Sequence, residues 1–134
     1  MAEVRIQALT QRFGDVTAVD DVTLSIADGE FVTLLGPSGC GKSTTLGAIA
    51  GLERATGGRI EVGGRVFFDA ARGTFLPAEK RNCGLVFQSY ALFPHMTVFD
   101  NCAFALKLRR VSAAEQKRRV LHALELVEMA ALAD

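Results

Sequence analysis

Hydrophobic and polar residues alternate in two short stretches near the start of the chain, at residues 4–9 and 22–26. Alternation with a period of two predicts a strand that buries one face. Residues 31–35 form instead a continuous apolar run, which favours a strand covered on both faces, as in a parallel sheet. A turn-rich region at residues 14–15 separates the first two strands, and Asp-Gly at residues 28–29 predicts a tight hairpin turn before the third.

The middle of the chain contains a helical segment among further strands. A glycine readily ends a helix because it adopts the left-handed conformation, and two glycines between alternating runs suit a two-residue hairpin. In chain order we expect a Gly-rich loop, a helix over residues 42–50 that Gly51 ends, a hairpin of residues 59–62 and 65–68 around Gly63 and Gly64, and a strand over residues 83–87.

The last third of the chain predicts two helices. Thr97 and Asp100 have the spacing of a capping box that opens a helix to about Leu108, and Ser112 with Glu115 repeats it. The second helix should bury one face, because apolar residues recur there at helical spacing; they are Val120, Leu124, Val127 and Ala131. The expected class is therefore α/β, with a β-rich part to about residue 95 and a helical part over residues 96–134.

Composition narrows the function classes. The 134 residues suffice for one domain, and 49% hydrophobic with 22% charged residues excludes a disordered polyelectrolyte. Fifteen basic and fifteen acidic side chains cancel, so we expect no nucleic-acid partner and no polybasic membrane patch. Any phosphate binding must come from local geometry.

Targeting signals and metal-binding spacings are not evident in the sequence. The first residues lack the shape of a signal peptide, and no stretch approaches the roughly 20 apolar residues that span a bilayer. Cys40, Cys83 and Cys102 form an odd set without metal-type pairing, which suits a reducing cytoplasm. We interpret Cys83 and Cys102 as small, half-buried filling residues, and His95 and His122 as surface residues.

One stretch carries candidate chemistry, since it fits the phosphate-loop pattern at every fixed position. Small residues let successive N–H groups point inward around an anion, and the following helix directs its positive end there. The alternative is a Gly-rich turn that happens to precede a helix. The predicted phosphate-binding residues are Gly36, Pro37, Ser38, Gly39, Cys40, Gly41, Lys42, Ser43 and Thr44.

Two of these residues have specific predicted roles. Lys42 would bring a mobile charge to the β- and γ-phosphates of ATP, and the Ser43 hydroxyl would ligate Mg²⁺. A thiol at Cys40, beside N–H donors and a helix N-terminus, is in surroundings that can favour a thiolate.

The flanking segments resemble the ATP-binding-cassette family. Phe13-Gly14-Asp15 with Ala18-Val19 is similar to the start of such domains, and residues 81–98, RNCGLVFQSYALFPHMTV, closely resemble the Q-loop region of bacterial importer ATPases for sugars, polyamines, iron or sulfate. Residues 51–53 and 57–58 match as well. The fold implied is that of a P-loop NTPase, with an antiparallel β-subdomain, part of a RecA-like core and the start of a helical subdomain.

The resemblance also assigns residues and partners. It implies that Phe13 stacks on adenine, worth about 1–3 kcal/mol, although Phe13 as an ordinary strand-end core residue is an alternative. It implies that Gln88, otherwise a solvated loop amide, contacts Mg²⁺ and its water, so that Lys42 and Gln88 are catalytic and Ser43 and Gln88 hold the metal. Residues 90–98 would lie near a groove for a transmembrane permease, and the intact protein would dimerise at the cytoplasmic face of the membrane.

Several parts of the family pattern are absent from these residues: the Asp-Glu strand, the Leu-Ser-Gly-Gly-Gln signature and the switch histidine. Asp20 and Asp21 do not replace the acidic pair, because no apolar strand precedes them. We therefore expect residues 1–134 to be the N-terminal part of one nucleotide-binding domain, inactive as an ATPase by itself. Two alternatives are a fragment that only binds nucleotide and a non-transport cassette protein of DNA repair or translation.

Overall fold

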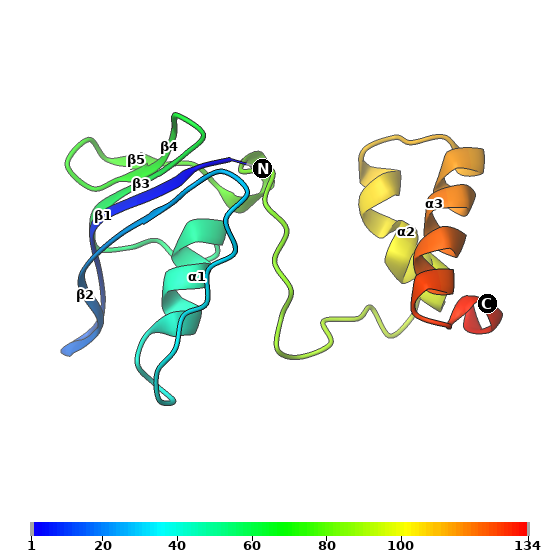
Figure 1. The fold of residues 1–134 in the computed structure, drawn as a ribbon, viewed down its shortest axis with the longest axis horizontal. Helices are drawn as coiled ribbons and strands as arrows, with labels where there is room; N and C mark the ends of the chain where they lie inside the picture. The colour runs from blue at the N-terminus through cyan, green and yellow to red at the C-terminus, as the bar shows by residue number, and fades with distance from the viewer. Residues whose placement is uncertain (1, 134) are drawn as a thin grey trace. The chain divides into compact units, whose positions relative to one another are not determined.

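The computed structural model describes residues 2–133, which form two compact units that divide between Val86 and Phe87 (Figure 1). The first unit contains β1 (Val4–Phe13), β2 (Val16–Ile26), α1 (Lys42–Ala50), β3 (Gly57–Val62), β4 (Arg65–Asp69), β5 (Thr74–Phe75) and the 3-10 turn η1 (Ala78–Lys80). The second contains α2 (Val98–Leu108), α3 (Ala113–Leu126) and η2 (Ala130–Leu132).

The strands of the first unit form one antiparallel sheet in the order β2-β1-β3-β4-β5. Helix α1 lies on one face of this sheet (Figure 1). The core between them includes Ile6, Leu9 and Ile60, which are almost fully buried, and Ala48 from α1. The sheet therefore supports the helix that follows the Gly-rich loop.

A bulge in β1 makes this core possible. Ile6 and Leu9 are three residues apart, so strict alternation would place them on opposite faces of the sheet. The pairing of β1 shifts between them, and Ala8 adopts a positive φ of 49°. The N–H of Ala8 donates to Thr23 Oγ1 at 3.0 Å. The bulge returns Leu9 to the core face, which a reading of alternation alone does not show.

Several predicted elements are confirmed. The helix at residues 42–50 has the predicted bounds, and Gly51 ends it with φ of 85° and an N–H that donates to the Gly47 carbonyl. Gly63 and Gly64 form the two-residue turn between β3 and β4, with φ of 56° and 76°. The first two strands exist but are longer than predicted, so that residues 14–15 are the short connection of a hairpin.

The strands predicted at residues 31–35 and 83–87 were wrong for the described chain. Neither segment is a strand, and every ladder within residues 2–133 is antiparallel. Phe31 is 92% exposed and Val86 97% exposed. A strand forms only where a neighbour completes its hydrogen bonds, and no described segment pairs with either one. The predicted hairpin at residues 28–29 is accordingly only a turn, closed by the Glu30 N–H on the Ala27 carbonyl.

The second unit is a pair of packed helices. α2 and α3 meet through Ala103, Val120 and Leu124. The Thr97 hydroxyl caps α2 by accepting from the Asp100 N–H at 3.1 Å, as predicted. Within residues 2–133, no helix combines the length and the apolar character needed to cross a membrane.

Two details of α3 differ from the prediction. Ser112 makes no side-chain cap bond, and the Glu115 carboxylate accepts from Arg118 and Arg119, so the predicted capping box is not formed. The helix ends at Leu126, so Val127 is its C-cap and is 60% exposed. Ala131 is exposed as well, in η2. Of the four apolar residues predicted to face the core, Val120 and Leu124 are buried and the other two are exposed.

Candidate functional site

The Gly-rich loop leads into the N-terminus of α1 through two glycines with left-handed backbone. Gly39 has φ of 83° and Gly41, the N-cap of α1, has φ of 88°. The N–H of Cys40 donates to the Pro37 carbonyl at 3.4 Å and closes a turn. These conformations are strained for residues with a side chain, so the loop curls where the sequence places glycine.

Gly41 also brings the loop close to the sheet. A Cβ there would overlap the carbonyl oxygen of Ala18 and press on the side chain of Val19 in β2. The Gly41 carbonyl then accepts from both the N–H and the hydroxyl of the buried Thr45, at 2.8 and 2.9 Å. The start of α1 is therefore held against β2 by a contact that only glycine permits.

The ammonium group of Lys42 lies within the loop. Its Nζ donates to the carbonyl oxygens of Gly36 and Pro37 at 2.8 and 2.7 Å, and lies 3.4 Å from Cys40 Sγ. The first turn of α1 contains no acidic residue, whereas α2 and α3 have Asp100 and Glu115 there. The positive end of α1 is thus not neutralised from its own first turn, and a full positive charge is added beside it, which favours an anion.

The groups that nucleotide and metal require are accessible. Ser43, the second residue of α1, is exposed. A single protein hydroxyl fits Mg²⁺, which keeps several waters and takes its remaining ligands from phosphates. The described residues contain no cluster of three or more His, Cys, Asp or Glu side chains that could hold a metal. The donor set thus fits a nucleotide-bound Mg²⁺ better than a metal held by the protein alone.

Phe13 and Gln88 lie outside the loop. Phe13 ends β1 and is 49% exposed, so it is not buried in the core. Gln88 is exposed and belongs to the second unit, whereas the loop belongs to the first. Adenine stacking by Phe13 and metal contact by Gln88 stay predictions.

Arg81 supports the far end of α1, and residue patterns did not single it out. It is 3% exposed. Its guanidinium donates to the carbonyls of Ala48 and Ile49 at 2.7 and 2.8 Å, and to those of Leu76 and Phe67 at 2.6 and 3.4 Å. Burial lowers the pKa of Arg81, yet arginine stays protonated in proteins. A positive charge therefore sits on the negative end of the phosphate-loop helix.

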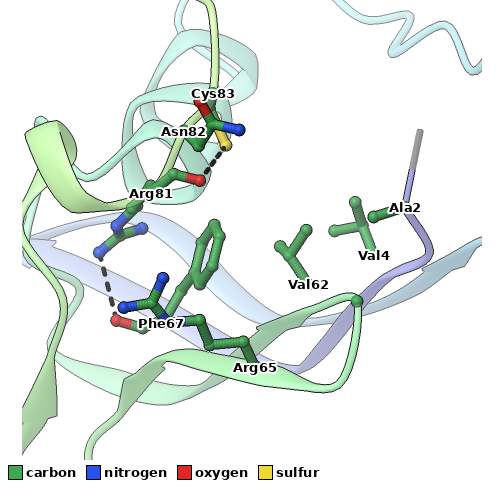
Figure 2. A pocket seen from close by; sticks show the side chains of 9 residues that line it. Ala2, Val4, Val62, Arg65, Phe67, Arg81, Asn82 and Cys83 are labelled. Atoms are coloured by element: carbon green, nitrogen blue, oxygen red, sulfur yellow. Dashed lines mark hydrogen bonds between the residues drawn. The ribbon is translucent and has the colours of Figure 1, made fainter. Parts of the chain in front are cut away.

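The rings of Phe67 and Phe75 complete this environment, with centroids 5.2 and 5.3 Å from the Arg81 guanidinium carbon. Arg81, Phe67, Val4 and Val62 are among the residues that line a groove of about 620 Å³. Figure 2 shows the Arg81 side chain beside Phe67, with Val62 and Val4 on the other side of the Phe67 ring. No residue of the Gly-rich loop before α1 lines this groove. It is therefore distinct from the phosphate-binding candidate.

A second groove, of about 500 Å³, lies in the helical unit and is mostly apolar. Leu92, Phe93, Pro94 and Met96 line it from the segment before α2, and Val127 and Met129 from the segment that follows α3. Leu92 is 66% exposed. Exposed apolar residues gathered in a groove are typical of an interaction surface.

The comparisons with known proteins agree with this geometry. Residues 19–134 match the family described as ABC transporter. The chain is 51% identical over 132 residues to the trehalose/maltose import ATP-binding protein MalK of Thermococcus litoralis, covering 98% of this chain and 36% of MalK. It is 54% identical over 129 residues to the spermidine/putrescine import ATP-binding protein PotA of Nitrosomonas eutropha, covering 96% of this chain and 34% of PotA. The chain thus spans about a third of the length of these curated relatives.

A solved structure also matches. It is a dimeric post-hydrolysis state of the ATP-binding cassette MJ0796 bound to ADP and Pi, with a TM-score of 0.80 and 30% identity. The match covers 97% of this chain and 60% of that one. The fold is therefore α/β and is the N-terminal part of a P-loop NTPase, as predicted. Because the family match spans most of the sequence and includes the loop that holds Lys42, the chain belongs to the ABC transporter family.

Proposed function

We propose that this chain is the nucleotide-binding, N-terminal part of the ATP-binding subunit of an importer, and that the whole protein couples ATP hydrolysis to import of a small solute. The observation that carries the proposal is the loop before α1, where the Lys42 ammonium and an uncompensated helix N-terminus converge. Relatives named as import ATP-binding proteins support the transport assignment. Their solutes differ, so the proposal extends to import and not to one solute.

The residues of the loop would bind and orient the polyphosphate. Lys42 would exchange its carbonyl partners, Gly36 and Pro37, for phosphate oxygens, which are stronger acceptors because they are charged. The N–H groups at the start of α1 would bind the same anion. Mg²⁺, held by the phosphates with Ser43 and Gln88, would neutralise charge that develops on the transferred phosphoryl group. Phe13 would stack on the adenine.

The groove of the helical unit is where we place the membrane partner. Import requires a channel through the membrane, and the apolar lining of Phe93, Pro94 and Met96 suits the apolar face of one short helix. We therefore propose that a cytoplasmic helix of a transmembrane permease docks there, with the ATPase at the inner face of the membrane. Residues 1–95 would be the β-subdomain and phosphate-loop core, and residues 96–134 the start of the helical subdomain, in a protein that works as a dimer.

Substitution of Lys42 tests the proposed site. In the full-length protein, Lys42→Ala should weaken binding of a fluorescent ATP analogue by at least about 10-fold, since a hydrogen bond to a charged group contributes about 1.5–3 kcal/mol. Lys117→Ala is the matched control, because Lys117 is an exposed lysine on α3. Equal affinity of both variants would refute the phosphate-loop assignment. Solute-dependent ATP turnover in vesicles containing the permease would then separate an importer from a non-transport cassette protein or a protein that only binds nucleotide.

A further inference from the structure

The side chain of Asn101, in the first turn of α2, binds the main chain of the segment that precedes the helix. Its Oδ1 accepts from the Phe93 N–H at 2.8 Å. Its Nδ2 donates to the carbonyls of Phe93, Met96 and Thr97 at 3.2, 3.2 and 2.9 Å. The partners dictate the orientation of the amide, because an N–H needs the oxygen and three carbonyls need the nitrogen.

These bonds shape one wall of the apolar groove. The Met96 N–H donates to the Phe93 carbonyl at 3.1 Å, so residues 93–96 form a turn whose two ends are both bound by Asn101. The centroid of the Phe93 ring lies 4.8 Å from that of the Phe104 ring and 6.0 Å from that of the His95 ring. Phe93, Pro94, Met96 and Asn101 itself all line the groove.

The same turn ends the segment that carries Gln88. Residues 88–92 form no helix or strand, and they join Gln88 directly to the turn at residues 93–96. A docked partner that moves the groove wall would therefore act on the residues that lead back to Gln88.

We propose that Asn101 is a positioning residue, whose amide holds the wall formed by Phe93, Pro94 and Met96 in the shape that accepts the permease helix and so couples docking to the Gln88 segment. The proposal rests on the proposed function, because it assigns that wall to permease docking. Asn101 does not contact nucleotide in this scheme. Its loss should impair coupling and leave nucleotide affinity unchanged, since Lys42 and its loop belong to the other unit.

The test compares three variants of the full-length protein with the parent. Asn101→Ala removes all four bonds. Asn101→Asp has nearly the same shape and keeps the acceptor for the Phe93 N–H, but presents an oxygen to three carbonyls. Gln116→Ala is the matched control, because the Gln116 amide donates to the Val111 carbonyl at 2.6 Å at a site that does not line the groove.

Three quantities are measured. Permease-stimulated ATP turnover in vesicles should fall about 10- to 100-fold in both Asn101 variants, since displacement of positioning groups by about 1 Å has effects of this size. Affinity for a fluorescent ATP analogue should stay within about twofold of the parent, which shows that the unit with the Gly-rich loop is intact. Cys83 and Cys102 are both exposed, so their interpretation as filling residues was wrong. The alkylation rate of Cys102, which lines the groove, should change about fivefold or more when the wall moves, with Cys83 as the internal reference.

The outcomes separate the two proposals. Normal stimulated turnover in Asn101→Asp or Asn101→Ala would overturn the role of Asn101. An equal loss in Gln116→Ala would overturn it too, because the effect would then be a general weakening of the helical unit. If the parent protein is not stimulated by the permease, the proposed function fails instead, and Cys102 alkylation decides alone whether Asn101 holds the wall. Unchanged Cys102 alkylation would refute that as well.

Discussion

Replacement of Arg81 should weaken the support of the phosphate-loop helix. Arg81→Met keeps much of the apolar stem but leaves the carbonyls of Ala48, Ile49 and Leu76 without their buried partner. Three short hydrogen bonds to a charged group contribute about 4.5–9 kcal/mol in total, at about 1.5–3 kcal/mol each. Burial of the guanidinium costs several kcal/mol, which the uncharged variant recovers. We therefore expect the free energy of unfolding to fall by ~3 kcal/mol.

The functional consequence follows from the position of Arg81. Its charge and its bonds fix the C-terminal end of α1, and the other end of that helix carries Lys42. A loosened helix should bind nucleotide about 10-fold more weakly, since about 1.4 kcal/mol of lost positioning is a factor of ten. Arg81→Lys should lie between Arg81→Met and the parent, because lysine keeps the charge but not the planar fork.

Urea unfolding and titration with a fluorescent ATP analogue measure both effects in the full-length protein. Arg65→Lys is the control, because Arg65 lines the same groove but is exposed and makes one 3.2 Å bond to the Lys80 carbonyl. If Arg81→Met unfolds within about 0.5 kcal/mol of the parent, the range of ordinary surface substitutions, the support assigned to Arg81 is wrong.

Two further predictions concern Cys40 and Glu115. The Cys40 thiol lies 3.4 Å from Lys42 Nζ. Mg-ATP at about 100 times its dissociation constant leaves about 1% of sites free, so it should slow alkylation of Cys40 by up to ~100-fold and leave that of Cys102 unaffected. Equal Cys40 alkylation rates with and without Mg-ATP would place the thiol outside the site. Hydrogen bonds from Arg118 and Arg119 lower the pKa of Glu115 to about 2. A depressed carboxyl pKa stabilises the folded state above the unfolded pKa, and this contribution is lost as pH falls from about 4.5 to 2. In Glu115→Gln, this acid-dependent loss of α3 stability, followed by NMR, should disappear. An acid-dependent loss of the same size as in the parent would contradict the prediction.

The sequence by itself determined the elements whose causes are local. Helix α1 has the predicted bounds because the signals that start and end it lie within a few residues, at Gly41 and Gly51. The Gly63-Gly64 turn and the Thr97 cap were predictable for the same reason. The Gly-rich loop before α1 was recognisable because its residue types stand at fixed spacing, and phosphate binding by this loop stays a prediction.

Tertiary structure decided the features that depend on partners far along the chain. Residues 31–35 have the composition of a buried strand, yet they are not one in the described chain, because β-structure requires a neighbour that completes its hydrogen bonds. The bulge at Ala8 needs the Thr23 hydroxyl across the sheet. Arg81 reaches carbonyls more than thirty residues earlier in the chain. Its residue type is common and its spacing carries no signal, so only the folded chain shows that it supports the phosphate-loop helix.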